Sequence, residues 1–150
     1  MKVPRPIEER FIAAAKPLMA LHPKLYRATG GRVGRRLPGL PPLLILDHVG
    51  AKSGTQRSSV LGYVADGRDV LIVASQGGSP THPAWFHNLR ANPDARIQIG
   101  TEVCDVRARV ASSDERARLW PKVTAAYSGF QRYQEHTDRE IPIVILEPRG

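Results

Sequence analysis

Six apolar or alternating segments along the chain predict β-strands, at residues 43–49, 57–65, 69–74, 95–100, 103–111 and 141–146. The Asp66-Gly67 pair between the second and third segments is a strong hairpin signal. In the fifth segment Cys104 shares the apolar side of the alternation with Val106, which favours a packing role over a nucleophilic one. No β-α-β alternation is present. The pattern therefore predicts an α+β protein, a small barrel of about six mostly antiparallel strands with flanking helices.

The N-terminal part of the chain has a different pattern. Residues 6–16 have the spacing of an amphipathic helix, and the prolines that follow leave residues 18–26 at most a short helical turn. Glycines and prolines predict a loop or an extended arm at 30–42. We therefore expect two parts, a basic arm at 1–42 and a barrel domain at 43–150.

Two helices are predicted within the barrel domain. Residues 83–91 form the first, with Pro83 at its first helical position and a Gly-Gly turn just before it that could bind an anion. The second begins near Ser112, because Ser112 and Glu115 have the spacing of a capping box. An aromatic segment, 127–133, should end this helix at its glycine.

Charge is concentrated at the N-terminus. The 150 residues carry a net charge of +8, and residues 2–36 hold nine basic and two acidic side chains, a net +7. Such a segment favours anionic partners, either nucleic acid or an anionic membrane surface, although it could also be a solvated arm. Nucleic acid is the weaker alternative, because no aromatic residues are interleaved there for base stacking. An amphipathic helix beside arginines would suit a membrane surface.

Several classes of function find no support. Cys104 is the only cysteine, and His82 and His87 are five residues apart, so no zinc-binding pattern is present and we expect no metal. Nucleophile-elbow, Walker A and dinucleotide-binding motifs are absent. No segment reaches the ~18 apolar residues of a membrane span, and the first residues lack the pattern of a signal peptide. We expect a cytoplasmic protein, possible also as a peripheral protein at the inner face of the membrane.

A turn bounded by two glycines is the clearest candidate for a binding site. Lys52 and Ser53 lie between Gly50 and Gly54, and Arg57 follows five residues after Lys52. A basic side chain with exposed amides and a hydroxyl can bind a phosphate. The alternative is a pair of solvent-facing hairpin residues.

Five features of the sequence together resemble a known protein family. They are the Lys52 turn, Arg57, the Asp66-Gly67 hairpin, the string SQGGSPTHPAWFHNLRANP at 75–93 and the segment YSGFQRYQEHTDREIPIVILEP. Residues 43–148 resemble the deazaflavin-dependent nitroreductase family of actinobacteria. The resemblance implies a split β-barrel that binds the deazaflavin coenzyme F420. FMN is the alternative cofactor, since related split barrels bind either one.

The resemblance also implies site residues. The phosphate and oligoglutamate tail of the coenzyme would lie at the Lys52 turn, and the ring near Ser75. The implied catalytic residues, which would donate hydrogen bonds to the reduced acceptor, are Ser75, Tyr127 and Tyr133, although the tyrosines could instead only pack as a lid. The implied cofactor residues are Ala51, Lys52, Ser53, Arg57, Ser58, Ser59, Val60, Leu61, Gly62, Val73, Ala74, Ser75, Gln76, Ala84, Trp85, Phe86, His87, Asn88 and Phe130.

The implied activity is hydride transfer from the reduced deazaflavin to a quinone-like or other conjugated or nitro acceptor. Three residues depart from the family pattern: Ala51 replaces a common arginine, Val60 a frequent proline, and Phe130 a tyrosine of a quinone- and nitro-reducing relative. Reduction of nitroimidazoles therefore does not follow from the resemblance. The alternative function is a protein that binds a deazaflavin or flavin without turnover.

Overall fold

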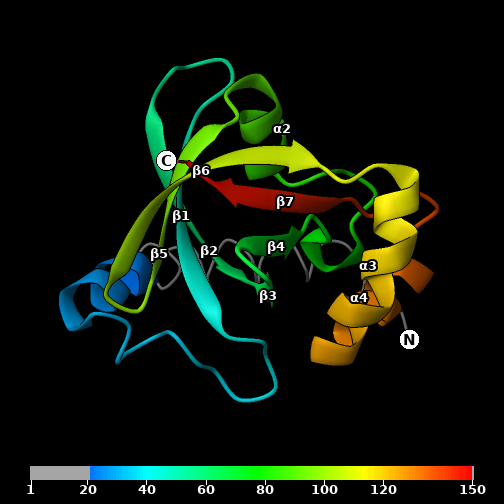
Figure 1. Ribbon diagram of the computed structural model, residues 1–150, viewed down its shortest axis with the longest axis horizontal. Coiled ribbons are helices and arrows are strands. Elements are labelled where there is room, and N and C mark those ends of the chain that lie inside the picture. The colour runs from blue at the N-terminus through cyan, green and yellow to red at the C-terminus, as the bar shows by residue number, and fades with distance from the viewer. Residues whose placement is uncertain (1–20, 150) are drawn as a thin grey trace, which may run out of the picture.

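A curled antiparallel sheet forms the centre of the computed structural model, which describes residues 21–149 (Figure 1). The seven strands are β1 (Leu43–Val49), β2 (Gln56–Gly62), β3 (Val64–Asp66), β4 (Asp69–Val73), β5 (Asp94–Ile99), β6 (Glu102–Val110) and β7 (Ile143–Pro148). Their order in the sheet is β2-β1-β5-β6-β7-β4-β3, and every pairing is antiparallel. The predicted α+β barrel is confirmed.

The helices lie around this sheet. Residues 21–29 are helical, and the later elements are a short 3-10 turn η1 (Gln76–Gly78), α2 (Ala84–Ala91), α3 (Ser113–Ala126) and α4 (Gly129–Glu135). In Figure 1, α3 and α4 lie together on one side of the sheet, α2 lies at its upper end and residues 21–29 lie at the opposite side.

One predicted strand is divided in the structure. The apolar pattern over 57–65 is continuous, but the chain breaks at Tyr63 into β2, which pairs with β1, and β3, which pairs with β4. Gly62 permits this crossing, because a Cβ there would lie 2.6 Å from Pro41 Cγ, and the Tyr63 amide donates to the Pro42 carbonyl at 3.0 Å. The crossing joins the two edges of the curled sheet. It also adds the seventh strand.

The prediction for residues 18–26 was wrong where the structure describes them. A helix continues to Thr29, because tertiary contacts stabilise it beyond its local sequence preference. Tyr26 is fully buried, and its hydroxyl donates to the Leu43 carbonyl at 2.9 Å and accepts from the Gly100 amide at 2.8 Å. The helix predicted at 6–16 lies outside the described residues. The domain boundary after residue 42 stays a prediction, although the contacts of Tyr26 join its two sides.

The helix starts agree closely with the sequence pattern. Pro83 is the N-cap of α2 rather than its first helical residue, a shift of one position. The predicted capping box of α3 is confirmed, since the Ser112 hydroxyl accepts from the Glu115 amide and the Glu115 carboxylate accepts from the Ser112 amide. Pro121 lies inside α3 without ending it. The aromatic segment after α3 forms the separate helix α4.

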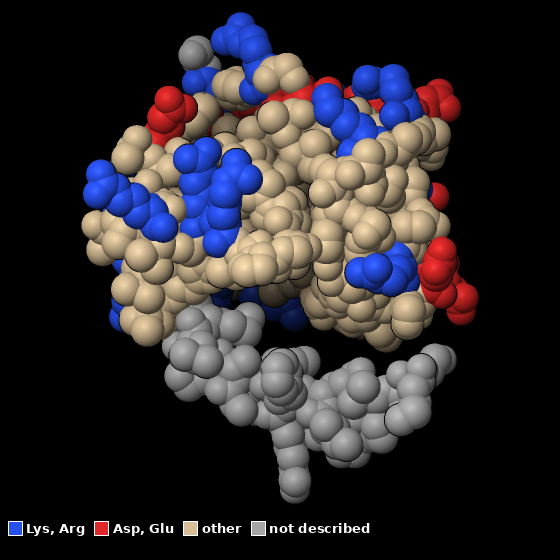
Figure 2. Space-filling model, turned by 90° about the horizontal axis from the view of Figure 1, so that it is seen from below, with Lys and Arg blue, Asp and Glu red and all other residues tan. Residues whose placement is uncertain are grey.

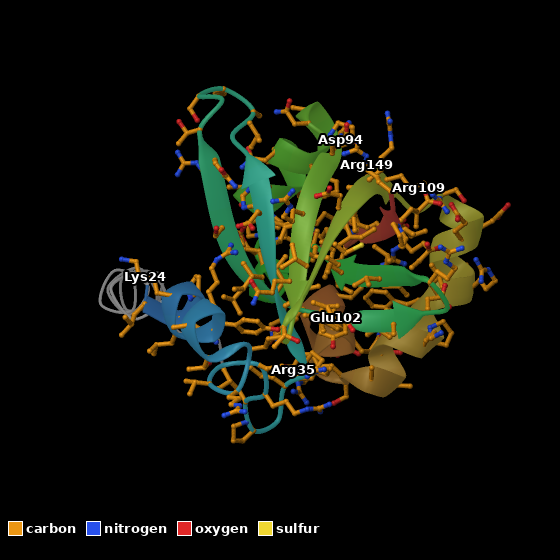
Figure 3. The ribbon with its side chains drawn as sticks, turned by 60° about the vertical axis from the view of Figure 1, so that its left-hand side comes forward. Lys24, Arg35, Asp94, Glu102, Arg109 and Arg149 are labelled. Atoms are coloured by element: carbon orange, nitrogen blue, oxygen red, sulfur yellow. The ribbon has the colours of Figure 1, made fainter. Side chains whose placement is uncertain are left out.

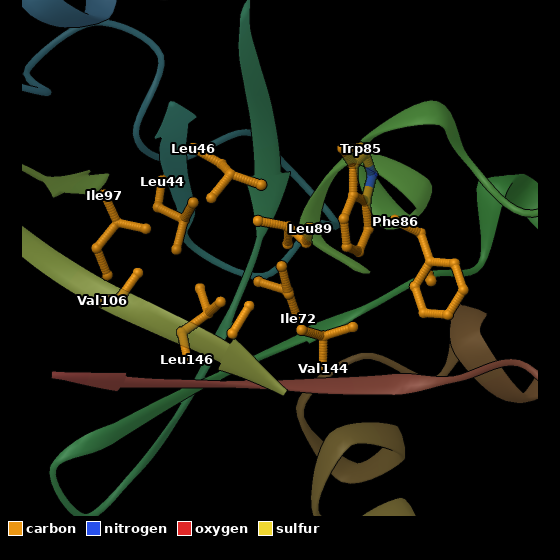
Figure 4. Packing of buried hydrophobic residues seen from close by; sticks show 12 residues of the cluster. Leu44, Leu46, Ile72, Trp85, Phe86, Leu89, Ile97, Val106, Val144 and Leu146 are labelled. Atoms are coloured by element: carbon orange, nitrogen blue, oxygen red, sulfur yellow. The ribbon is translucent and has the colours of Figure 1, made fainter. Parts of the chain in front are cut away.

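Two apolar clusters hold the elements together. The inner cluster fills the curl of the sheet beneath α2 (Figure 4), and it contains Leu44, Leu46, Ile72, Ala74, Trp85, Phe86, Leu89, Ile97, Val106, Ala108, Val144 and Leu146. The outer cluster packs α3 and α4 on the sheet, and it contains Leu71, Val73, Leu119, Val123, Phe130, Ile141, Ile143 and Ile145. Strands β4 and β7 therefore have apolar residues on both faces, which explains their continuous apolar sequences. Cys104 packs partly against the inner cluster, as predicted.

We predict that Tyr26→Phe lowers the free energy of unfolding by about 1–3 kcal/mol, because the buried Gly100 amide loses its acceptor. Denaturation in urea, followed by circular dichroism, measures the change. The matched control is Tyr63→Phe, since the half-buried Tyr63 has no side-chain hydrogen bond to any residue in 21–149. Equal unfolding midpoints for the two variants would contradict the prediction.

Candidate functional site

The turn between β1 and β2 presents exposed backbone amides. The Gly50 amide donates to the Thr55 carbonyl at 2.8 Å, and the Gly54 amide donates back to Gly50 at 3.0 Å, so the turn is closed at its base. Lys52 and Ser53 are exposed at its tip, and no residue in the described range 21–149 accepts a hydrogen bond from their amides. The turn therefore has free donors beside a lysine, as an anion site requires.

A chain of hydrogen bonds, buried at its centre and part-buried at its ends, connects this turn to helix α2. The Ala51 amide donates to Asn88 Oδ1 at 2.9 Å, and Asn88 Nδ2 lies 3.1 Å from His48 Nδ1. His48 Nε2 lies 2.9 Å from the Ser59 hydroxyl. Burial lowers the pKa of His48, with a further lowering by Arg57 and an opposing effect of Asp47. Residues of β1, β2 and α2 thus meet behind the turn.

Strand β2 divides its predicted site residues between two faces. Ser59 bonds to His48 and Leu61 packs against the inner cluster, whereas the Ser58 hydroxyl donates to Asp47 Oδ1 at 2.6 Å. Because side chains alternate along a strand, Ser58 shares its face with Val60 and Gly62 and not with Ser59. The structure therefore does not bring the consecutive residues of 57–62 to one surface.

The segment after β4 turns sharply at the predicted catalytic serine. Ser75 is 8% exposed, and the next three residues, Gln76, Gly77 and Gly78, have φ angles of +43°, +62° and +80°. Left-handed φ is costly for a residue with a side chain, so Gln76 stores strain in this turn. Among residues 21–149, no atom would lie within 4 Å of a Cβ on Gly77, so these residues leave the outside of the turn open. A Cβ on Gly78 would lie 2.8 Å from the Tyr133 carbonyl oxygen, so α4 lies directly against the turn.

Arg139 holds this strained turn, and the sequence interpretation missed it. Its guanidinium donates to the carbonyls of Ala74 (3.2 Å), Ser75 (2.8 Å) and Ser79 (2.8 Å), and to His82 Nδ1 at 3.0 Å. The pKa of His82 is lowered by burial first and then by the Arg139 charge. Arg139 thereby fixes the positions of Ser75 and of the segment that enters α2.

Gln134 fixes Arg139 in turn. Its amide nitrogen donates to the Arg139 carbonyl at 2.8 Å, while its oxygen accepts from the Ile141 amide and from Arg116. Arg116 lies over the Trp120 ring, 4.3 Å from its centroid. The segment between α4 and β7 is thus fastened to both α3 and α4.

Three aromatic rings lie together where α3 ends and α4 begins. The hydroxyls of Tyr127 and Tyr133 are 3.1 Å apart, and the Phe130 ring lies edge-on to Tyr127 with centroids 5.0 Å apart. Hydrogen bonding to Tyr127, and then burial, raises the pKa of Tyr133 to about 12. Tyr133 is therefore a neutral hydroxyl at neutral pH. Phe130 belongs to the outer cluster and is 7% exposed.

Helix α2 presents only part of its predicted set to solvent. Ala84 and His87 are exposed, whereas Trp85, Phe86 and Asn88 are buried. The buried side chains of Trp85, Phe86 and Asn88 therefore act by packing and by positioning the residues around them. The Phe86 ring also contacts His82, with centroids 4.6 Å apart.

A separate cleft of about 210 Å³ lies between α2 and strands β6 and β7. It is lined by Phe86, Leu89, Arg90, Pro93, Ala108, Arg109, Val110 and Val144. Of the predicted site residues only Phe86 reaches it, so this cleft is not the predicted site. Within residues 21–149, no three His, Cys, Asp or Glu side chains are grouped as metal ligands would be.

Comparison with known proteins decides the family. Residues 18–148 match the family model of the F420H2-dependent quinone reductases. The chain belongs to this family. An F420H2-dependent quinone reductase of Mycobacterium tuberculosis is 44% identical over 135 residues, which cover 88% of this chain and 91% of the relative.

Solved structures support the same assignment. An F420H2-dependent reductase is 39% identical, with a TM-score of 0.66, and the match covers 71% of this chain and 94% of that one. A domain-swapped dimer is 32% identical, with a TM-score of 0.68, and the match covers 95% and 99% of the two chains. The predicted family, split-barrel fold and cofactor F420 are confirmed.

The residues of this quinone reductase family member fit such a cofactor. The free amides of the Lys52 turn suit an anionic tail, and the open outer side of Gly77 leaves room beside Ser75. Helix α2 and the segment just before it join the two regions, through Asn88 in the helix and His82 before it. The role of each predicted site residue stays a prediction.

We predict that Arg139→Met lowers the free energy of unfolding by about 2 kcal/mol, because three carbonyls lose a charged donor. Amide hydrogen exchange should also become faster in residues 75–79. Urea denaturation and exchange mass spectrometry measure the two effects. The control is Arg132→Met, which removes an exposed arginine of the same region. If both variants behaved alike, Arg139 would not hold the turn.

A second prediction concerns the tyrosine pair. Tyr127→Phe should lower the pKa of Tyr133 from about 12 toward the ordinary value of 10, because the largest cause of the shift is the bond to Tyr127. Ultraviolet absorbance during an alkaline titration reports phenolate formation. Tyr63→Phe removes a tyrosine elsewhere and should leave the late-titrating group in place. A late-titrating tyrosine that persists in Tyr127→Phe would contradict the assignment.

Proposed function

We propose that this chain transfers a hydride from reduced coenzyme F420 to a quinone. The observation that carries the proposal is that α2 bonds to the Lys52 turn through Asn88, while Arg139 bonds both to the Ser75 carbonyl and to His82 just before α2. The Tyr133 backbone of α4 lies against the same serine turn at Gly78. The proposal agrees with the family of the chain and with the name of its M. tuberculosis relative.

The Lys52 turn would bind the anionic part of the coenzyme. Lys52 and Arg57 would supply positive charge, and the amides of Lys52 and Ser53 would donate hydrogen bonds. Ala51 lacks the charge of the common arginine, and its amide is already bonded to Asn88. Binding of the anionic part of F420 would therefore depend more heavily on Lys52 and Arg57 than it would with an arginine at position 51.

Bound F420H2 supplies a hydride from C5 of its deazaflavin ring. The protein would orient the acceptor and stabilise the negative charge that develops on its oxygen. Ser75 and Tyr133 are suited to this, since both can donate a hydrogen bond. Tyr133 remains protonated at every pH well below about 12, because its hydroxyl is held in the bond to Tyr127. Only one hydroxyl can donate within this pair, so when Tyr133 donates to Tyr127 the Tyr127 proton would be free for the acceptor.

Mixing reduced F420 with menadione and catalytic amounts of the protein tests this function. We expect the absorbance of oxidised F420 to appear with multiple turnovers, and Ser75→Ala to slow its appearance. Binding of reduced F420 without any oxidation would instead favour the alternative, a protein that holds the cofactor without turnover.

We predict that Lys52→Gln and Arg57→Gln each raise the Kd for F420 by about tenfold, the effect of losing one charged hydrogen bond. Cofactor fluorescence measures the Kd. The control is Arg68→Gln, which removes an exposed charge from the β3–β4 turn. Equal effects of all three variants would show a dependence on net charge alone and would remove the turn from the site.

A membrane surface is a further proposed partner, supported by the surface of residues 21–40. Five large apolar side chains are at least 41% exposed there, namely Leu21, Leu25, Val33, Leu37 and Leu40. Five basic and no acidic residues lie in 21–36, and Figure 3 shows Lys24 and Arg35 at this side. From below, basic side chains lie among uncharged ones, with the acids toward the edges (Figure 2). No helix in residues 21–149 is long and apolar enough to cross a membrane.

Liposome flotation tests this surface. We expect the protein to float with vesicles that contain an anionic lipid and to be released by salt, because exposed basic groups near a membrane are screened by ions. The double variant Leu21→Gln with Leu25→Gln should weaken flotation, while Val103→Gln, at another exposed apolar position, should not. Equal flotation with neutral lipid would remove the electrostatic part of the proposal.

A further inference from the structure

While His48 is neutral, the hydrogen-bond chain behind the Lys52 turn has only one consistent arrangement of protons. A backbone amide can only donate, so the atom of Asn88 that faces Ala51 must be its oxygen. The Asn88 nitrogen then faces His48 Nδ1, which must be an unprotonated acceptor. The remaining ring proton lies on Nε2, where it is donated to the Ser59 hydroxyl. A single backbone amide thus fixes the orientation of Asn88 and the tautomer of His48.

This arrangement uses the oxygen and one of the two N–H groups of the Asn88 side chain. The side chain is 7% exposed, and both its oxygen and its nitrogen have partners. Because the side chain is so little exposed, Asn88 has little surface with which to bind a cofactor directly, in contrast to the role that its position suggests. What it controls is the Ala51 amide, one residue before Lys52.

Protonation of His48 would break the arrangement. A second ring proton on Nδ1 would face the Asn88 nitrogen, placing two donors against each other. Turning the Asn88 amide over would satisfy His48, but the amide nitrogen would then face the Ala51 N–H. Either way one hydrogen bond of the chain is lost. Without the turn of the amide two buried donors face each other, which is costly, and with it the Ala51 amide loses its acceptor.

We propose that Asn88 and His48 are positioning residues that hold the Lys52 turn in its anion-binding form only while His48 is neutral. This inference rests on the proposed function, because the anion is taken to be the tail of F420. The charged groups that act on His48 are Asp47 on its own strand and Arg57 on β2, and α2 faces it with the uncharged Asn88.

The sign of the pH effect follows from the surroundings of His48. Burial lowers its pKa below the ordinary 6.5, so the neutral form and its contribution to stability are fully present above that value. The contribution is lost as the pH falls from 6.5 through the lowered pKa. Affinity for F420 should weaken over the same acidic range.

Three variants test the inference through two readouts, the Kd for F420 and the hydrogen-exchange rate of the Ala51 amide in the cofactor-free protein. Asn88→Leu keeps a similar volume but removes both bonds. We expect Ala51 exchange to be faster and the Kd to rise, each by about tenfold at neutral pH. Asn88→Asp retains an acceptor for Ala51 and adds one for a protonated His48. It should therefore keep slow exchange and lose the acid weakening of affinity.

The control is Gln98→Leu, which removes a buried side-chain amide of similar exposure that bonds to Gly100 instead of to the turn. It should leave Ala51 exchange and the pH dependence of the Kd unchanged. The inference would be overturned if the Ala51 amide of Asn88→Leu exchanged at the wild-type rate. It would also be overturned if Gln98→Leu showed the same faster exchange and the same rise in Kd. A wild-type protein that does not bind F420 would refute the proposed function alone, and the exchange of Ala51 would still decide the role of Asn88.

Discussion

The packing of α2 against the inside of the curled sheet is the interaction on which the rest of the site depends. Trp85, Phe86 and Leu89 are each at most 7% exposed and belong to the inner cluster. Burial of side chains of this size contributes about 1.5–3 kcal/mol each. Because this face is fixed, Asn88 is held against the Lys52 turn, and His82, just before the helix, is held against Arg139.

Much of the fold could be predicted because it is encoded by local patterns. Strand alternation, the glycine hairpin at β3–β4 and the capping box of α3 are all set by neighbouring residues. The misses all depend on distant contacts. The helix at 21–29 is stabilised by bonds from Tyr26 to Leu43 and Gly100, and the break at Tyr63 by the passage of Pro41 and Pro42 beside β2. Neither of these contacts changes the local pattern of apolar and polar residues, so the pattern could not predict them.

In the candidate site, too, the sequence indicated the segments but not the contacts between distant residues. The resemblance to a family supplied the segments, but it could not say which way a side chain points or what it bonds to. Ser58 and Ser59 are neighbours in sequence, yet one bonds to Asp47 and the other to His48. Arg139 lies in a segment without periodicity, so its four acceptors could be found only in the folded chain. The Lys52 turn and the Ser75 turn are therefore positioned by Asn88 and Arg139, whose hydrogen-bond partners the sequence did not indicate.

The property on which the activity rests is that this barrel binds a deazaflavin with an anionic tail rather than an ordinary flavin. Titration of the purified protein with F420 and with FMN, side by side under the same conditions, tests it most directly. We expect F420 to bind more tightly by at least about tenfold, since its longer anionic tail can reach the donors of the Lys52 turn. Equal or tighter binding of FMN would contradict the claim.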